Sequence, residues 1–207
     1  MLSGAQLRDE GGFMLIELIV AAMLMLIMLS AFTGLYTMLG GRASTVEKQE
    51  VLTAQARPML DTMAAELQDA ICNGTTQPIT SASGTQVTFT TPDRQQPYHL
   101  QQITYTLAGG VLSRQVALST NTGGPPWTMG TARASTTATS VTNATVFDFI
   151  SSSGADLSPG GAAVTAANLP SIAKATMTLV VAPPAGRGSG SLTAETSASL
   201  RTPTCNS

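Results

Sequence analysis

The sequence predicts an α+β protein, with a long N-terminal α-helix packed on a head built from an antiparallel β-sheet. Two observations predict this class. An apolar run from Phe13 to about Leu39 is followed, beyond Gly41, by apolar residues at every third or fourth position as far as Ile71. After Gly74 the pattern changes to short stretches of alternating apolar and polar residues, which are typical of strands. We therefore expect a helix that spans a membrane in its first half and is amphipathic in its second, and then a β-rich head.

The apolar run is long enough to cross a bilayer and contains a single charged residue. Between Phe13 and Gly41 that residue is Glu17. About 20 apolar residues in a helix span a hydrocarbon core of about 30 Å. An acidic side chain at the centre of such a helix costs about 2.5 to 3.5 kcal/mol, and this run contains no Lys, Arg or His to pair with it. Glu17 therefore needs a cation from elsewhere.

The residues in front of the span carry a specific order. A short polar leader ends in Gly11-Gly12, and Phe13 and Glu17 follow at the start of the run. This order resembles the processing site of type IV prepilins, with Gly12 before the cut and Phe13 after it. The resemblance implies that prepilin peptidase removes the leader and that the new amino terminus at Phe13 is N-methylated. It also implies that Glu17 is an assembly contact, paired with the amino terminus of a neighbouring subunit.

The resemblance also implies the division and the partners of the chain. We expect a leader at 1–12, a transmembrane or filament-core helix at 13–41, and a pilin-like head at 42–207 with its helix ending near residue 72. The product would be a single-pass membrane protein with its head outside the cytoplasm, and later a structural, minor subunit of a type IV pilus or a type II secretion-like pseudopilus. Its partners would be prepilin peptidase, other pilin or pseudopilin subunits, the inner-membrane assembly platform and membrane lipid.

Three other interpretations of the apolar run stay open. A secretory signal peptide would be cut after its apolar core, where Gly41-Arg42-Ala43 offers small residues, but Asp9 and Glu10 are unusual in its leading region and the core is too long. A plain signal anchor explains the hydrophobicity and leaves Gly12 and Glu17 unexplained. A buried helix of a soluble protein would need other apolar segments to enclose it, and no other segment of this sequence is apolar enough.

The second half of the helix is expected to pack on the head. Its apolar positions recur at steps of three and four: Leu52, Ala56, Met59, Leu60, Met63, Leu67, Ala70 and Ile71. Pro58 should kink or locally open the helix, because it lacks an N–H and its ring collides with the carbonyl four residues back. Gly34 is the corresponding weak point of the span. The resemblance to pilins, many of which carry a helix-breaking proline near this distance from the cut, implies that the helix melts here during assembly; the alternative is a small residue for close packing on another helix.

The head is expected to consist of strands and turns. The alternating stretches are residues 86–90, 98–107, 111–118, 145–150, 172–182 and 192–201, and the polar stretches 121–143, 151–168 and 183–191 are predicted loops. Gly109-Gly110 between two alternating stretches predicts a hairpin. The hairpin residues Ile103-Thr104-Tyr105-Thr106-Leu107 and Val111-Leu112-Ser113-Arg114 also resemble the strand pair of J-type minor pseudopilins, which implies a minor subunit.

Composition excludes several function classes. Charged residues make up 11% of the chain and its net charge is −2, with Lys and Arg scattered singly, so we expect no intrinsic nucleic-acid binding. We also expect no enzymatic activity and no cofactor, because His99 is the sole histidine and no nucleophile and base can be grouped. A secreted enzyme tethered by the helix remains the alternative. Asp148 and Asp156 offer too few carboxylates to predict a calcium site.

Two further features concern the exported part. Cys72 and Cys205 are the only cysteines, and a bridge between them would fasten the C-terminal tail to the helix end. Two free thiols, or bridges between molecules, are the alternatives. Trp127, the only tryptophan, lies in a Gly- and Pro-rich loop and either folds back onto the head or contacts a partner. The second possibility corresponds to a rival function, a pilus-tip adhesin or binding module.

Overall fold

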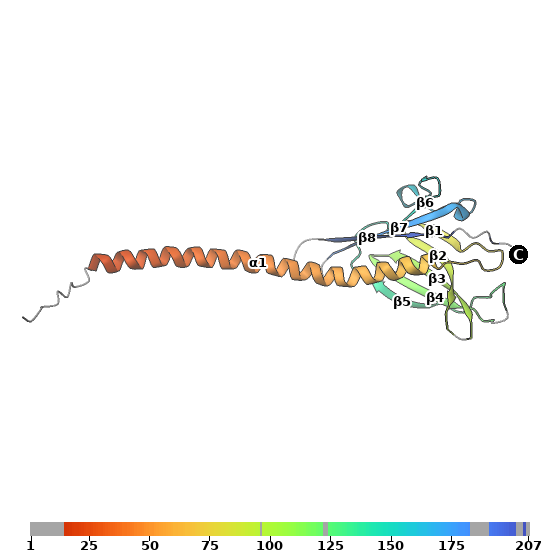
Figure 1. The fold of residues 1–207 in the computed structure, drawn as a ribbon, viewed down its shortest axis with the longest axis horizontal. Coiled ribbons are helices and arrows are strands. Elements are labelled where there is room, and N and C mark those ends of the chain that lie inside the picture. The colour runs from red at the N-terminus through yellow and green to blue at the C-terminus, as the bar shows by residue number, and fades with distance from the viewer. Residues whose placement is uncertain (1–14, 96, 122–123, 183–190, 202–204, 206–207) are drawn as a thin grey trace, which may run out of the picture. The chain divides into compact units, whose positions relative to one another are not determined.

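The computed structural model describes residues 15–95, 97–121, 124–182, 191–201 and 205; for residues 39–55 it describes the helical backbone and not the side chains. The chain divides into two compact units, Met1–Glu47 and Lys48–Ser207. Helix α1, Leu15–Gln68, contributes residues to both units. Figure 1 shows α1 and the strands that follow it along the chain. The predicted α+β class is confirmed at this level, as a helix packed on antiparallel sheet.

The second unit contains two antiparallel sheets rather than the single sheet expected. The first has the strand order β1-β2-β3-β4-β5, so that neighbours in sequence are neighbours in the sheet: Ile79–Ser83, Gln86–Asp93, His99–Ala108, Val111–Leu118 and Arg133–Ala138. The second has the order β6-β7-β8: Phe147–Ser151, Ile172–Val181 and Leu192–Ser199. Two short 3-10 helices, η1 (Pro159–Gly161) and η2 (Leu169–Ser171), lie between β6 and β7.

The predicted hairpin forms between β3 and β4. Gly109 and Gly110 have φ angles of +57° and +74°, and a two-residue turn with both φ angles positive favours glycine because other residues are strained there. The register that this turn fixes places Tyr105 opposite Arg114 and Ile103 opposite Val116. Directly opposite residues of an antiparallel pair lie on the same face of the sheet, so these four side chains share a face.

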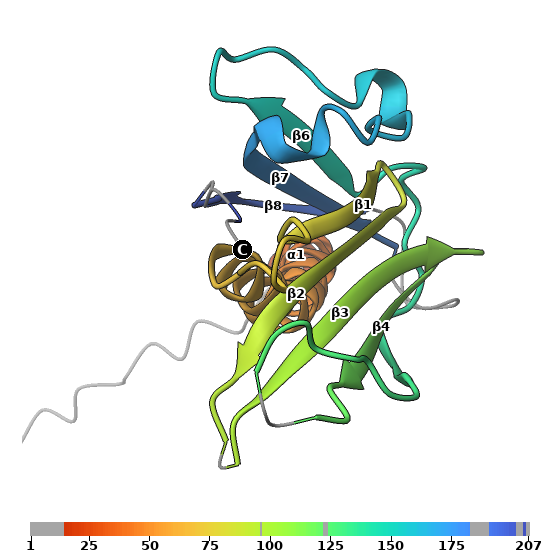
Figure 2. The same ribbon diagram turned by 90° about the vertical axis from the view of Figure 1, so that its right-hand side faces the viewer.

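One hydrophobic core joins α1 to both sheets. On α1 the buried residues Ala56, Leu60, Met63 and Leu67 follow the predicted three- and four-residue steps. The strands supply further large buried side chains, among them Val87, Phe89, Ile103, Tyr105, Leu112, Phe147, Phe149, Met177 and Leu179. Figure 2 shows α1 end-on with β1–β4 and β6–β8 around it. The apolar face of this part of α1 is therefore the element around which the head is packed.

Gly84 joins the two sheets through its backbone. It lies in the turn between β1 and β2, its N–H donates to the carbonyl of Gly161 (3.0 Å), and its carbonyl accepts the N–H groups of Val146 (2.7 Å) and Phe147 (3.1 Å). A Cβ at this position would lie 2.6 Å from the Cα of Gly161 and 2.7 Å from the Cγ2 of Thr145. The close approach of the sheets therefore requires glycine.

The structure corrects several predicted boundaries. Helix α1 ends at Gln68 rather than near residue 72, because the N–H of Ile71 donates to the carbonyl of Thr90 on β2 (2.8 Å) and the sheet replaces the helix as its partner. The helix is continuous through Pro58, where a kink or a local opening was expected. Two strands, β1 and β5, were not predicted, and β5 lies inside the predicted loop 121–143.

Candidate functional site

The first candidate site is the apolar surface of α1 in the first unit. Leu15–Met38 is one helical stretch of 24 residues, long and apolar enough to cross a membrane. Every described side chain in it is exposed, and the exposed fractions of its large apolar residues run from 43% at Ile19 to 80% at Tyr36. An apolar surface of this size needs lipid or other protein to cover it.

The serine and threonine hydroxyl groups of this stretch donate hydrogen bonds to carbonyls of the helix itself. Ser30 donates to the carbonyl of Ile27 (2.8 Å), Thr33 to those of Leu29 and Ser30 (2.9 Å each), and Thr37 to those of Thr33 (3.1 Å) and Gly34 (2.9 Å). Hydroxyls bonded in this way do not require water and are tolerated in an apolar environment. A Cβ at Gly34 would meet no atom within 4 Å.

Glu17 is the charged residue of this stretch and lies in the first turn of α1. The N-terminal end of a helix carries a partial positive charge, which favours a carboxylate there. That effect is smaller than the cost of placing an unpaired carboxylate in hydrocarbon. Gly12 and Phe13, the predicted cleavage and methylation residues, lie outside the described residues.

The second candidate site holds the end of α1 to the five-stranded sheet. Glu66 accepts a hydrogen bond from the Tyr105 hydroxyl on β3 (2.6 Å to Oε2). It also accepts two from the Arg114 guanidinium on β4, from Nη2 to Oε1 at 2.6 Å and from Nε to Oε2 at 3.3 Å. The side chains of Arg114 and Glu66 are 26% and 19% exposed. We call Glu66, Tyr105 and Arg114 the helix clamp.

Burial makes the helix clamp a strong one. Burial and the hydrogen bond to Glu66 raise the pKa of the Tyr105 hydroxyl above its ordinary value. Burial alone would lower the pKa of Arg114, but the Glu66 carboxylate raises it above its ordinary value. Bidentate Arg–carboxylate contacts with an added hydroxyl donor are among the stronger polar contacts in proteins. The clamp therefore fixes the rotation of α1 against β3 and β4.

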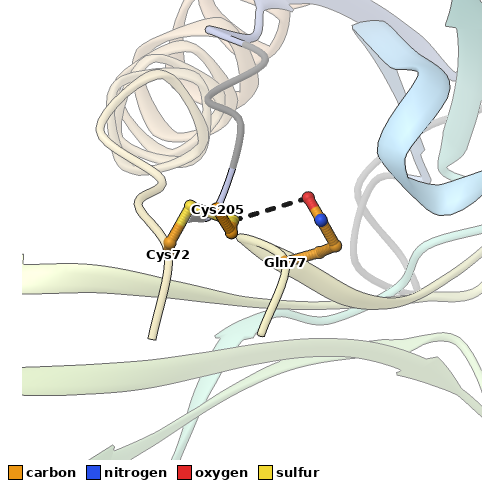
Figure 3. Close-up of a disulfide and its surroundings, with 3 residues drawn as sticks. All are labelled: Cys72, Gln77 and Cys205. Carbon is orange, nitrogen blue, oxygen red and sulfur yellow. Dashed lines mark hydrogen bonds between the residues drawn. A yellow bond between two sulfur atoms is a disulfide. The ribbon is translucent and has the colours of Figure 1, made fainter. Parts of the chain in front are cut away.

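A second link fastens the chain beyond α1. Cys72 and Cys205 form a disulfide that closes a sequence separation of 133 residues, as expected from the sequence (Figure 3). The Sγ of Cys205 also lies 3.5 Å from the side-chain oxygen of Gln77, which precedes β1. The bridge ties the residues that follow β8 to the segment between α1 and β1. All cysteines of the chain are in this bond.

The structure places the remaining candidate residues in structural roles. The N–H of Trp127 donates to Asn73 (2.7 Å), Asn73 donates back to the Trp127 carbonyl (3.0 Å), and the indole lies edge-on to Tyr98 with ring centroids 5.7 Å apart. The Nδ1 of His99 lies 3.1 Å from the carbonyl oxygen of Ser119, the residue that directly follows β4. Trp127 thus holds its loop on the head, and His99 links the start of β3 to the residue after β4.

Asp148 and Asp156 meet at one residue, Ser158. Asp148 accepts a hydrogen bond from the Ser158 hydroxyl (3.2 Å), and Asp156 accepts one from the Ser158 N–H (2.8 Å). Both carboxylates therefore stabilise the loop after β6. Within the part of the chain that the structure describes, no group of three or more His, Cys, Asp or Glu residues is placed to hold a metal ion.

Comparison with known proteins gives no family for this chain: no protein-family model matches it, and no curated protein is similar to it at a significant level. The assignment of function therefore depends on the residues and the geometry described above.

The helix clamp was not predicted from the sequence, although its signal was present. Glu66 lies between Met63 and Leu67 on α1, at the border of the apolar stripe, where a carboxylate is half-buried. The hairpin turn at Gly109-Gly110 fixes a register that pairs Tyr105 with Arg114. A buried tyrosine opposite an arginine on the helix-facing side of a hairpin is a signal for a carboxylate on the helix.

Proposed function

We propose that this chain is a structural subunit of a type IV pilus or of a type II secretion-like pseudopilus, without enzymatic activity. Prepilin peptidase would cut between Gly12 and Phe13, and the mature protein would leave the membrane and enter the filament through the first part of α1. The observation that carries the proposal is the exposed apolar stretch Leu15–Met38 with Glu17 in its first turn. Lipid covers such a surface before assembly, and neighbouring helices cover it afterwards.

The presence of Glu17 favours a role in assembly over a role as a simple membrane anchor. A helix that only anchors a head gains nothing from Glu17, because the carboxylate makes insertion less favourable. A new α-amino group at Phe13 would supply the missing cation when it comes from a neighbouring subunit. The polar leader and Gly12 are also unnecessary in a plain anchor, and both have a purpose in the proposed processing.

A binding module centred on Trp127 has less support. The backbone of Trp127 is bonded on both sides to Asn73, and its indole packs on Tyr98, so the loop is used to complete the head. The head would act in the proposed filament as an exported domain, with the inner-membrane assembly platform and other pilin or pseudopilin subunits as partners.

The substitution Glu17→Leu tests the proposal. It removes the desolvation cost, so the variant should insert into membranes at least as well as the wild type, yet its recovery in sheared filaments should fall by about tenfold or more. Glu17→Gln keeps the size and the hydrogen-bonding capacity and removes the charge, and it should fail in the same way. Met25→Leu, at an exposed apolar position, is the control and should assemble normally. Normal recovery of both Glu17 variants would refute a charged assembly contact.

A further inference from the structure

The helix-facing side of the five-stranded sheet is covered by α1 over only part of its width. Where β3, β4 and β5 meet, an open groove of about 840 Å³ remains. Its lining includes Gln101, Val116 and Leu118 along its floor, the cations Arg114 and Arg133, and the acid Asp93. All six belong to the head, and none has a part in the proposed processing or in the helix surface of the first unit.

The floor of this groove carries two apolar side chains, Val116 and Leu118, that the head does not fully cover. Leu118 is 46% exposed and, with Tyr98, makes up the exposed large hydrophobic residues among the described part of Lys48–Ser207. The register places Leu118 opposite Gln101, and Val116 between Ile103 and Arg133. An exposed leucine beside a half-buried valine, in a head that otherwise buries its large apolar side chains, indicates a contact surface.

The strand β5 forms one side of the groove and is an edge strand. It pairs with β4 only, and the side chains of Arg133–Thr136 are exposed on both faces of the sheet. Edge strands are commonly protected by proline, lysine or a covering element, because their free N–H and C=O groups pair readily with another chain. Apart from Arg133 at its start, β5 has no charged residue and no proline. Its free edge is available for β-strand addition.

Charge selects the kind of strand that fits. Arg114 is neutralised by Glu66, whereas the side chain of Arg133 has no hydrogen bond or ion pair with any residue that the structure describes. In a strand added to β5, the residue opposite Arg133 would have its Cβ about 5 Å away on the same face. An acidic residue at that position would pair with Arg133, and apolar residues two positions on either side would face the groove.

We propose that the free edge of β5 is a docking site for an extended acidic segment of a partner protein. The segment would pair its backbone with β5, place a carboxylate on Arg133 and direct flanking apolar side chains to the face of the sheet that also carries Val116 and Leu118. A lysine opposite Arg133 would be repelled, so the site discriminates by charge.

The test uses the full chain in detergent micelles and two labelled peptides, Leu-Thr-Glu-Thr-Leu-Thr and its match with Lys in place of Glu. Fluorescence anisotropy should show the Glu peptide binding about tenfold more tightly than the Lys peptide. Arg133→Glu should reverse that preference, because the charge opposite the central residue of the peptide changes sign. Arg201→Glu makes the same change of charge at an exposed residue beyond β8 and should leave binding unchanged.

Hydrogen exchange identifies the binding mode in the same samples. Bound Glu peptide should slow the exchange of amides in β5, because edge N–H groups become bonded to the added strand. Equal binding of the two peptides, an Arg133→Glu variant that behaves like Arg201→Glu, or protection that excludes β5 would each overturn the proposal.

Discussion

At the scale of single residues, the helix clamp explains why a charged side chain is tolerated on the packed face of α1. Glu66 is surrounded by apolar neighbours, yet its two oxygens receive three hydrogen bonds from Tyr105 and Arg114. The sequence showed Glu66 only as one of several acids between apolar positions of the helix. Its partners lie 39 and 48 residues away in the sequence, so the spacing of apolar and charged residues along the helix could not reveal them.

Removing the carboxylate should destabilise the head. Glu66→Ala leaves Arg114 partly buried without its partner and Tyr105 without an acceptor, so the free energy of unfolding should fall by about 2 to 4 kcal/mol. Denaturant unfolding of the full chain in detergent, followed by the fluorescence of Trp127, measures it. Asp61→Ala, an exposed acid on the same helix, is the control and should change stability by less than about 0.5 kcal/mol. Equal effects of both variants would show that the clamp adds nothing.

The Tyr105 hydroxyl predicts a specific pH dependence. Its pKa in the folded head lies above the unfolded value of about 10. The stabilisation is therefore complete below about pH 10 and is lost above it, because the unfolded chain releases a proton that the folded chain keeps. Near pH 8 the free energy of unfolding of the wild type should exceed that of Tyr105→Phe by about 1 kcal/mol, and its melting temperature should be higher. Both differences should disappear toward about pH 11. A difference in melting temperature that stays constant over this range would contradict the assigned environment of Tyr105.

At the scale of elements, the sequence predicted the strands in which the alternation of apolar and polar residues matches the alternation of buried and exposed positions. The strand β4 was predicted at its observed bounds, and the ends of β3 and β7 were within one residue, because apolar and polar residues alternate there and glycine marks the turn. The strand β5 is exposed on both faces from Arg133 to Thr136 and half-buried after that, so it has no alternation to detect. The strand β1 is short and contributes mainly Ile79 and Ala82 to the core. Both strands form because a neighbouring strand supplies hydrogen bonds, which local sequence does not encode.

The junction of the two sheets makes Gly84 a turn position that is sensitive to substitution. Gly84→Ala would place a Cβ against the backbone of Gly161 and the side chain of Thr145, so the sheets must separate, at a cost of about 2 to 3 kcal/mol. Gly109→Ala has open space around its Cβ and should cost only about 1 kcal/mol, from its positive φ angle. Thermal unfolding of the two variants ranks these effects. A smaller loss for Gly84→Ala than for Gly109→Ala would contradict the described junction.

At the scale of the whole molecule, the disulfide encloses most of the head. Its sequence separation of 133 residues means that the cross-link restricts the unfolded chain strongly. The double variant Cys72→Ser/Cys205→Ser should therefore lose about 2 to 5 kcal/mol of stability while still inserting into membranes and being processed. Limited proteolysis and melting of the head measure the loss. Unchanged melting, or loss of processing in a folded variant, would contradict this role.

The sequence could predict the candidate function but not the surface that we infer for β5. The order Gly12, Phe13 and Glu17 before an apolar run is a local signal, and it lies in a few consecutive residues. The groove beside β5 depends on which strands are neighbours and on how much of the sheet α1 leaves uncovered. Those are properties of tertiary packing. The sequence does not show that Leu118 and Arg133 border one groove, because this depends on the pairing of β4 with β5.

The central claim is that the chain is matured by a cut directly in front of Phe13. The most direct measurement is the intact mass of the protein recovered from the membranes of cells that contain a prepilin peptidase. The proposal predicts a species that begins at Phe13, with one added methyl group and one disulfide, and predicts that Gly12→Val keeps the leader. A wild-type protein that still begins at Met1, or one that begins near Ser44, would contradict it.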